Sequence, residues 1–277
     1  MVVPAPEPQA DKPHVTVGIP FHRGACAEHL RLAVDSILNQ THRPYRVHLI
    51  QDGPVSDDLT ALVNDYVARG PHIEHLLIPD NSGLPNALNL SIQQTRSPYY
   101  ARMDADDISR PDRLEVEARY LEEHPAVDIV GSWAIEFHDD PDEADTFLRK
   151  LPTDQPDIAR IFHYRSPFVH PSVMFRRSVF DRIGLYDLWW TTAQDYELWA
   201  RALRHGVGLA NIADPLLYLR VNGKVAKRSR LMEIVRQARA RYRYNTWSPV
   251  SNVLKISAVL FRLMPGPVRQ WAYRHLR

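Results

Sequence analysis

The amino-acid sequence predicts an α/β fold: a single domain with a central, mainly parallel sheet flanked by helices, followed by a basic helical C-terminal tail. Short apolar runs alternate with stretches of helical periodicity through the first hundred residues, and the connections are long enough for helical crossovers between parallel strands. The composition, 44% hydrophobic and 24% charged, is that of a globular protein. The charge is uneven, since residues 224–277 hold 13 of the 34 Lys and Arg residues but only one of the 33 acids.

The predicted elements follow in chain order. Strands are expected where β-branched and other apolar residues form short runs, at 15–19, 45–50, 72–78 and 99–103. Helices are expected where apolar residues recur every three or four positions, at 30–38, 58–68, 84–94 and from Leu114 onward. The first strand is expected to stop at Pro20, because proline has no N–H to donate to a sheet. In the second half, 168–177 is predicted to be a strand entered through a polar loop, and 194–203 a helix.

The chain divides into three predicted parts: a loose tail at 1–13, one folded domain at 14–222 and a basic amphipathic tail at 223–277. The amino terminus lacks the apolar run of a signal peptide, and no stretch approaches the ~20 apolar residues that span a membrane. Cys26 is the only cysteine, which fits a reducing compartment. We therefore predict a cytoplasmic protein that is at most peripheral at the inner face of the cell membrane.

Polar residues follow three of the predicted parallel strands: His22 the first, Asp52 the second and Asp104 the fourth. In open parallel sheets, ligands bind beyond the carboxyl ends of the strands. These residues therefore predict a nucleotide pocket at this edge of the sheet. Asp52 taken alone is equally consistent with a solvent-exposed loop.

The segment 101–113 is the most informative in the chain, because it places Asp104, Asp106 and Asp107 directly after a strand. Three carboxylates so close together repel one another unless a cation lies between them. Mg²⁺ and Mn²⁺ take oxygen ligands and share them with substrate phosphates. The alternative is a helix N-terminus, where acids favour the helix dipole. It fits Asp112 and extends to Asp107, but it leaves Asp104 and Asp106 unexplained, so we predict a metal site.

Asp195 lies at the predicted start of a helix and is flanked by aromatic residues. Trp189 and Trp190 precede it and Trp199 follows it. One interpretation is a helix N-cap. The other is a general base beside a surface on which a sugar stacks. The residue pattern alone does not choose between them.

Together these segments resemble the family 2 glycosyltransferases of the GT-A fold, and most of all the bacterial exopolysaccharide and capsule transferases of the amylovoran-biosynthesis type. The resemblance covers residues 15–220. Its motifs occur in the family's order, at 19–21, 36–41, 51–53, 81–89, 101–113, 170–174 and 195–199. Each motif alone is weak, but the long acidic segment followed by the Asp195 segment is highly specific.

The resemblance implies a role for each matching residue. Asp104 and Asp106 would form the metal-binding DxD motif, with Asp106 as the direct ligand, and Asp195 would be the catalytic base. Residues expected to bind the nucleotide-sugar are Pro20, Phe21, His22, Asp52, Asn81, Gly83, Asn89, Arg102 and Asp104; of these, Pro20 and Phe21 would line the base and Asp52 would bond to the base or ribose. Residues expected on the acceptor side are His170, Trp189, Trp190 and Trp199.

The implied activity is metal-dependent, inverting transfer of a hexose from a nucleotide-sugar, with UDP as the expected nucleotide, to a lipid-linked or polysaccharide acceptor in cell-surface glycan synthesis. Three positions depart from the family's pattern: Gln51 and Gln194 where an acid is frequent, and Asn222 where a histidine is frequent. A sugar-1-phosphate nucleotidyltransferase shares the fold class and the metal, but it usually carries a Gly-rich basic loop after the first strand. A non-catalytic glycan-binding protein has no need of a carboxylate cluster.

The basic tail invites two interpretations. Residues 231–244 interleave arginines with tyrosines, and 253–263 form a short, mostly apolar helical pattern. Such a segment suits an anionic membrane surface, where a lipid-linked acceptor would lie. The alternative is a helical hairpin packed on the acidic domain. The tail contains no recognised nucleic-acid-binding module, so nucleic acid is not a predicted partner.

Overall fold

The computed structural model describes residues 12–141, 146–221, 231–244 and 248–264. The strands are β1 (Val15–His22), β2 (Arg46–Asp52), β3 (Ile73–Ile78), β4 (Tyr99–Arg102), β5 (Ile108–Ser109), β6 (Ile129–Phe137), β7 (Phe147–Arg149), β8 (Met174–Arg176) and β9 (Leu209–Arg220). The helices are α1 (Ala27–Leu38), α2 (Asp57–Ala68), α3 (Leu84–Gln94), α4 (Arg113–Glu123), α5 (Gln155–Ile161), α6 (Val179–Ile183), α7 (Gln194–Arg204), α8 (Leu231–Arg243) and α9 (Pro249–Leu263), with a 3₁₀ turn, η1 (His170–Ser172).

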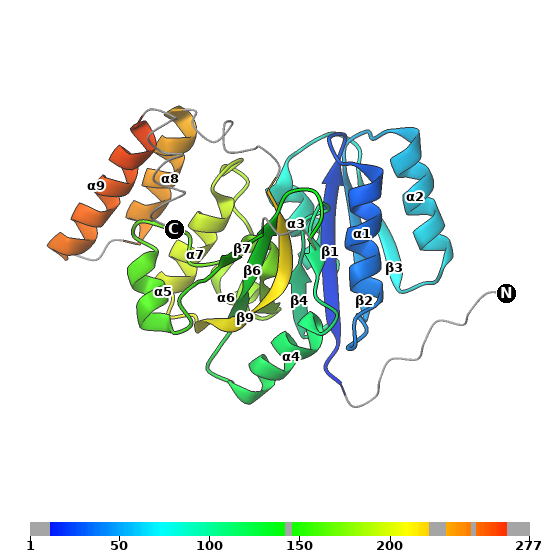
Figure 1. The fold of residues 1–277 in the computed structure, drawn as a ribbon, viewed down its shortest axis with the longest axis horizontal. Helices are drawn as coiled ribbons and strands as arrows, with labels where there is room; N and C mark the ends of the chain where they lie inside the picture. The colour runs from blue at the N-terminus through cyan, green and yellow to red at the C-terminus, as the bar shows by residue number, and fades with distance from the viewer. Residues whose placement is uncertain (1–11, 142–145, 222–230, 245–247, 265–277) are drawn as a thin grey trace.

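One sheet runs through the molecule in the order β3-β2-β1-β4-β8-β6-β9-β5, with β7 paired to β6. β3, β2, β1 and β4 are parallel, as the alternation of strands and helices predicts. β8 then pairs antiparallel with both β4 and β6, and β6 is parallel to β9. Helices lie on both faces of this sheet (Figure 1). The predicted α/β class with a mainly parallel sheet is confirmed.

β1 continues through Pro20 to His22, so the prediction that it stops at Pro20 is wrong. The carbonyl of Gly18 faces β4, because it accepts a hydrogen bond from the amide of Met103. Backbone groups alternate between the two sides of a strand, so the nitrogen of Pro20 faces that same side. The register with β4 ends at Gly18, and the missing N–H of Pro20 therefore breaks no ladder hydrogen bond.

The second half of the sheet departs further from the predicted elements. Only Met174–Arg176 of the expected strand at 168–177 is β-structure, because His170–Ser172 forms a 3₁₀ turn around Pro171. β9, the longest strand, was not predicted. It carries Asp214 and Pro215, which interrupt its apolar pattern where its register with β6 shifts.

The sheet separates two hydrophobic clusters, one on each face. The first joins the apolar sides of α1, α2 and α4 to β1, and the second joins α3, α5, α6 and α7 to the other face. Tyr99 and Ala101 of β4 belong to the first cluster, whereas Tyr100 between them belongs to the second. This alternation is what a strand buried on both faces requires.

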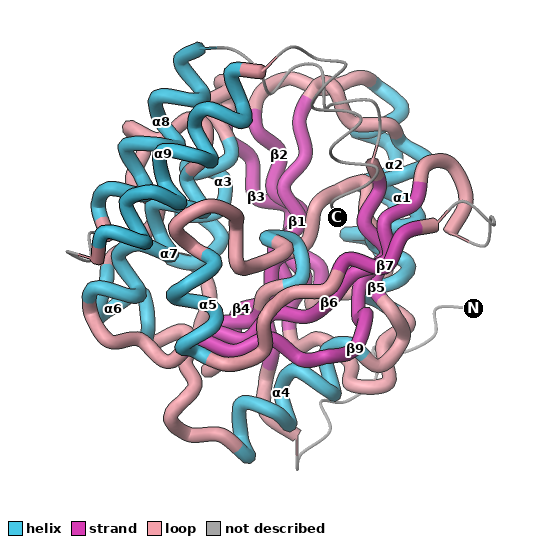
Figure 2. The backbone as a smooth tube through the Cα atoms, turned by 60° about the vertical axis from the view of Figure 1, so that its left-hand side comes forward, coloured by secondary structure: helices cyan, strands magenta, loops and turns pink. Residues whose placement is uncertain are grey.

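The tail forms two helices beside the domain, at the end of the molecule opposite α2 (Figure 1), and Figure 2 shows them side by side. α8 contacts α7, and α9 contacts α8. Two arginines of α8 attach it to the domain: Arg241 is 1% exposed, and Arg243 pairs with Glu197 at 3.0 Å. The packed-hairpin interpretation therefore holds for α8. Among the described residues, no helix combines the length and apolar character needed to cross a bilayer.

Candidate functional site

The predicted nucleotide and metal residues come together where β1, β2 and β4 end. β1 and β2 are in register to their last residues, so His22 lies opposite Asp52. β4 pairs with β1 as far as Gly18 opposite Arg102, and Asp104 leaves the sheet two residues later. The carboxyl ends of these parallel strands thus bring residues from three separate segments to one edge, as expected for a ligand site.

Asp52 organises the loop after β3. Its side chain is 6% exposed and accepts four hydrogen bonds: at Oδ1 from the amide (2.7 Å) and hydroxyl (3.0 Å) of Ser82, and at Oδ2 from the amide of Gly83 (2.9 Å) and Nδ2 of Asn81 (3.1 Å). A carboxylate offers about four acceptor positions, so all are filled. The carboxylate therefore positions Asn81 and Gly83, and its expected bond to the base or ribose stays a prediction.

The tip of β1 offers the site different groups from those expected. Phe21 is 2% exposed and stacks on His75 in the core, with ring centroids 6.4 Å apart, so its ring cannot line a nucleotide base. Pro20 is half-buried. His22 is exposed, and its Nδ1 accepts a hydrogen bond from the amide of Gly24 at 2.9 Å. The backbone of Phe21 and the exposed ring of His22 are the groups that this tip has available.

Asp104, Asp106 and Asp107 form a compact carboxylate cluster, with one oxygen of each within 4.8 Å of the others. Asp104 and Asp106 are half-buried and Asp107 is 1% exposed. Oδ1 of Asp107 accepts a hydrogen bond from the amide of Arg220 at 2.9 Å, whereas its Oδ2 has no hydrogen-bond partner among the described residues. A buried carboxylate oxygen without a donor, beside two further carboxylates, fits a hard divalent cation such as Mg²⁺ or Mn²⁺.

The electrostatics of the cluster support the same conclusion. Burial, and then the negative charges of Asp104 and Asp106, raise the pKa of Asp107 well above its usual value. A divalent cation would offset this repulsion and keep Asp107 ionised. The helix N-terminus interpretation of Asp107 is wrong, because α4 begins at Arg113 and its N-cap is Asp112.

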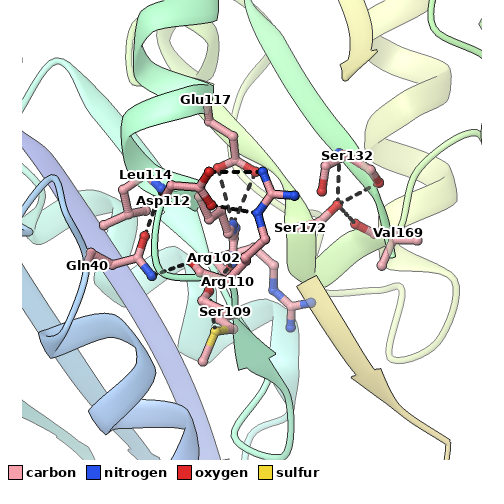
Figure 3. Close-up of polar contacts among 12 residues, drawn as sticks. Gln40, Arg102, Ser109, Arg110, Asp112, Leu114, Glu117, Ser132, Val169 and Ser172 are labelled. Carbon is pink, nitrogen blue, oxygen red and sulfur yellow. Dashed lines mark hydrogen bonds and ion pairs between the residues drawn. The ribbon is translucent and has the colours of Figure 1, made fainter. Parts of the chain in front are cut away.

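A buried ion pair supports the strand end beneath this cluster. Arg113 and Glu117 are both 0% exposed, and Nε of Arg113 lies 3.1 and 3.2 Å from the two carboxylate oxygens of Glu117. Arg113 also donates to the carbonyl of Arg102 (2.9 Å) and the hydroxyl of Ser109 (3.2 Å); Figure 3 shows Glu117, Arg102 and Ser109 in this region. The side chain of Arg102, 1% exposed, donates to Asp104. The acidic segment is therefore anchored at its base.

Arg220, at the end of β9, is a residue that the sequence did not single out. It is 7% exposed, and besides its amide bond to Asp107 it donates from Nε to the carbonyl of Asp106 at 3.0 Å and from Nη1 to the carbonyl of Asp139 at 2.8 Å. These contacts fix the turn that carries the cluster. Arg220 and Asp107 are 113 positions apart, so no local pattern could have revealed the pairing.

Asp195 is the second residue of α7 and follows Ala193, the N-cap, whose φ of 60° is left-handed. The N-cap interpretation of Asp195 is therefore wrong. Burial raises the pKa of the Tyr186 hydroxyl. The positive charge of Arg102 lowers this pKa, and the negative charge of Asp195 raises it. Contacts place Tyr186 beside α7: its hydroxyl lies 2.8 Å from Nε2 of His170, and the ring of His170 packs edge-on against Trp199, one turn after Asp195.

Tyr186 is fixed by two residues that were expected to contact substrates. Asn89 is 8% exposed; it donates to the carbonyl of Tyr186 at 2.8 Å and accepts from its amide at 2.9 Å. Asn89 thus positions Tyr186, and its expected contact with the nucleotide stays a prediction. Nε2 of His170 lies 2.8 Å from the Tyr186 hydroxyl. Burial and the charge of Arg102 lower the pKa of His170 well below 6.5, so its imidazole is neutral near pH 7.

The three tryptophans expected on the acceptor side differ in exposure. Trp190 and Trp199 are 1% and 0% exposed and belong to the core, so they cannot stack on a sugar, and that expectation is wrong. Trp189 is 52% exposed, and the guanidinium of Arg239 lies 5.0 Å from its ring centroid. Trp189 is therefore the only one of the three that is exposed to solvent. Asn222, one of the departures from the family's pattern, lies outside the described residues.

Two solved structures share this fold. S. aureus TarS 1–349 in complex with UDP aligns with a TM-score of 0.66 over 94% of this chain and 75% of its own, at 15% identity. The mannosyltransferase PcManGT from Pyrobaculum calidifontis, in complex with GDP-Man and Mn²⁺, aligns with a TM-score of 0.64 over 93% of this chain and 72% of its own, at 19% identity. The fold is the GT-A glycosyltransferase fold.

Sequence relatives agree with this fold. An uncharacterized glycosyltransferase of Haemophilus influenzae is 33% identical over 77% of each chain. The amylovoran biosynthesis glycosyltransferase AmsE of Erwinia amylovora is 30% identical over 89% of this chain and 92% of its own. An Escherichia coli protein named UDP-Gal:alpha-D-GlcNAc-diphosphoundecaprenol beta-1,3-galactosyltransferase is 29% identical over 87% and 88%.

The family profile of glycosyl transferase family 2 matches residues 16–184, which run from β1 to the residue after α6 and include the carboxylate cluster. More than half of the chain is therefore matched, and the carboxylates lie where the fold places a ligand. The chain belongs to glycosyl transferase family 2.

Proposed function

We propose that this protein transfers a hexose from a nucleotide-sugar, UDP-hexose in the first instance, to a lipid-linked or polysaccharide acceptor, with a divalent cation and with inversion at the anomeric carbon. The observation that carries the proposal is the carboxylate cluster at the tip of β4, at the edge of the sheet where ligands bind, with Asp195 at the start of α7 as the candidate base. Transfer from a sugar diphosphate needs both a cationic site for the diphosphate and a base for the acceptor hydroxyl.

Asp104, Asp106 and Asp107 would hold the cation. When bound, Mg²⁺ or Mn²⁺ supplies Lewis-acid stabilisation of the negative charge on the diphosphate leaving group. Arg102, fixed beneath the cluster, has an Nε without a hydrogen-bond partner among the described residues. That N–H would help to orient the donor, because a buried guanidinium is a strong donor to phosphate oxygens.

Asp195 would act as the general base. Its carboxylate would take the proton from an acceptor hydroxyl as the oxygen attacks the anomeric carbon, on the side opposite the diphosphate. A single displacement of this kind inverts the anomeric configuration. Tyr186, held by Asn89 and His170, would fix the geometry between Asp195 and the donor. General base catalysis of this kind contributes about 10²–10⁴-fold to a rate.

The acceptor would approach from the side of Trp189. An exposed indole suits stacking on a sugar ring, and the nearby guanidinium of Arg239 suits a phosphate on the same acceptor. The diphosphoundecaprenol acceptor in the name of the Escherichia coli relative has this combination of sugar and phosphate. A lipid-linked diphospho-sugar is therefore the acceptor that we propose to test first.

The experiment combines donor screening with an Asp195→Asn variant. UDP-, GDP- and dTDP-sugars are screened by thermal shift with and without Mn²⁺, and transfer with the best donor is then followed by the release of nucleoside diphosphate. We expect Asp195→Asn to reduce the transfer rate by about 10²–10⁴-fold with unchanged donor affinity. Asp65→Asn, an exposed position on α2, is the matched control and should retain full activity.

Two results would contradict the proposal. Near-normal turnover by the Asp195→Asn variant would remove Asp195 from the chemistry. Release of pyrophosphate from a nucleoside triphosphate and a sugar 1-phosphate, with no transfer from any nucleotide-sugar, would identify a nucleotidyltransferase instead.

A further inference from the structure

Helix α9 presents an apolar face to solvent. Its exposed apolar side chains are Val250 (68% exposed), Val253 (61%), Ile256 (52%), Leu260 (56%) and Leu263 (54%), with Ser257 as an exposed polar residue beside them, and Met264 (44%) extends the face by one residue. Successive members lie three or four positions apart, so they share one side of the helix. Water-facing helix surfaces are normally charged, and a continuous apolar face of this kind marks a contact surface.

The inward side of α9 has the opposite character. Lys255 is 0% exposed, its Nζ donates to the carbonyl of Tyr244 at 3.0 Å, and burial lowers its pKa. The helix thus turns its lysine toward α8, whereas Val253, Ile256 and Leu260 point outward. A helix that only packed on the domain would show the reverse arrangement.

The charge of the sequence around α9 indicates which kind of partner its apolar face contacts. The 22 residues that follow Lys255 contain four Arg residues and no acid. A symmetric pairing of two copies through α9 would bring these like-charged segments together, which opposes association. An anionic surface attracts the same segment.

The length of the helix indicates how it would meet such a surface. Fifteen residues of α-helix extend about 22 Å, less than the ~30 Å hydrocarbon core of a bilayer. A helix of this length with one apolar side lies in the interface with that side buried among the acyl chains.

We propose that the outward face of α9 docks the protein on an anionic lipid bilayer. The proposal rests on α9 and its charge environment and does not require the transferase reaction. It corrects the sequence-based expectation in one respect: the arginines of α8 are not the membrane contacts. Arg236 donates to the hydroxyl of Thr191 at 2.5 Å and Arg243 pairs with Glu197, so these residues attach α8 to the domain.

This attachment gives docking a fixed orientation. α8 packs on α7, the helix that carries Asp195, and the Thr191 contact lies in the loop just before α7. A bilayer bound to α9 would therefore stand in a defined position relative to the site. That arrangement suits an acceptor whose reactive sugar projects from a lipid.

The test uses flotation of the full chain with vesicles of phosphatidylcholine alone and of phosphatidylcholine with phosphatidylglycerol. Leu260→Glu places an acid in the outward face of α9, and Leu77→Glu on β3 is the matched control, because both leucines are 56% exposed. We expect the wild-type protein and the Leu77→Glu variant to float with anionic vesicles only. Leu260→Glu should lower the floated fraction by roughly fivefold or more, with an unchanged melting temperature.

Several outcomes would overturn the proposal: equal flotation with neutral and anionic vesicles, no flotation of the wild-type protein, or unaltered flotation of the Leu260→Glu variant. A dimer in sedimentation velocity that Leu260→Glu dissociates would assign the face to a second copy instead. Flotation is read without donor or acceptor, so its failure is distinguishable from failure of the transferase proposal, which the release of nucleoside diphosphate reports.

Discussion

Substitution of Asp52 by asparagine separates its positioning role from a direct contact with the nucleotide. The carboxylate is 6% exposed and accepts four hydrogen bonds between 2.7 and 3.1 Å. An asparagine oxygen can replace one carboxylate oxygen but not the other, because its NH₂ group donates. Two of the four donors therefore lose their acceptor, whichever way the amide is oriented.

The expected loss of unfolding free energy follows from these contacts. A hydrogen bond to a charged group contributes about 1.5–3 kcal/mol, so two lost bonds amount to about 3–6 kcal/mol of unfolding free energy. The loop at 81–83 would also lose its fixed shape, because the amides of Ser82 and Gly83 bond to this carboxylate. Donor affinity should fall together with stability, because both depend on the same loop.

Urea unfolding followed by circular dichroism measures the first effect, and isothermal titration with the donor measures the second. Asp80→Asn is the matched control, because Asp80 is exposed in the same loop. We expect the control to change stability by less than about 0.5 kcal/mol. A strong loss of donor affinity by Asp52→Asn with a stability change below about 1 kcal/mol would refute the argument and restore a direct contact.

Three further predictions concern the cluster and its support. Asp107→Asn should weaken Mn²⁺ binding by roughly tenfold or more, because it removes a charged oxygen ligand. Isothermal titration measures this affinity, and an unchanged value would exclude Asp107 from the site. Glu117→Ala should lower the unfolding free energy at pH 8 by about 3–5 kcal/mol, because it leaves the buried charge of Arg113 without its carboxylate. The double substitution Arg113→Met with Glu117→Leu should recover most of the lost stability, and a cost of Glu117→Ala below about 1 kcal/mol would contradict the prediction. Burial raises the pKa of Glu117 from 4.5 to about 7, so between these pH values the folded protein keeps a proton that the unfolded chain releases. The unfolding free energy should therefore fall as the pH rises from 4.5 to 7. Glu117→Gln should flatten this pH dependence, and an equal slope in both proteins would argue against the raised pKa.

Local patterns were sufficient for the first half of the fold. The apolar spacing of Leu30, Ala33, Val34 and Ile37 marks α1, and all four are buried against β1 and its neighbours. The parallel arrangement followed from strands separated by helix-length connections. The position of the acidic segment at a strand end then followed from topology alone.

The remainder depends on contacts between distant residues. Asn89 and Tyr186 are 97 positions apart, and nothing near either residue indicates that one holds the other. The burial of Phe21, Trp190 and Trp199 likewise depends on which elements cover them. An aromatic residue beside a functional motif fits a core as well as a binding surface, so the sequence could not assign these side chains.

The link between Arg220 and the acidic segment has a consequence for how the protein is made. A ribosome adds about 5–20 residues per second, so about 6–23 seconds pass between synthesis of Asp107 and of Arg220, 113 positions later. Until β9 has emerged and paired with β6, the turn at Asp106 and Asp107 lacks the guanidinium that fixes it. The carboxylate cluster is encoded in the first half of the chain, but its turn is fixed only when nearly the whole transferase domain has left the ribosome.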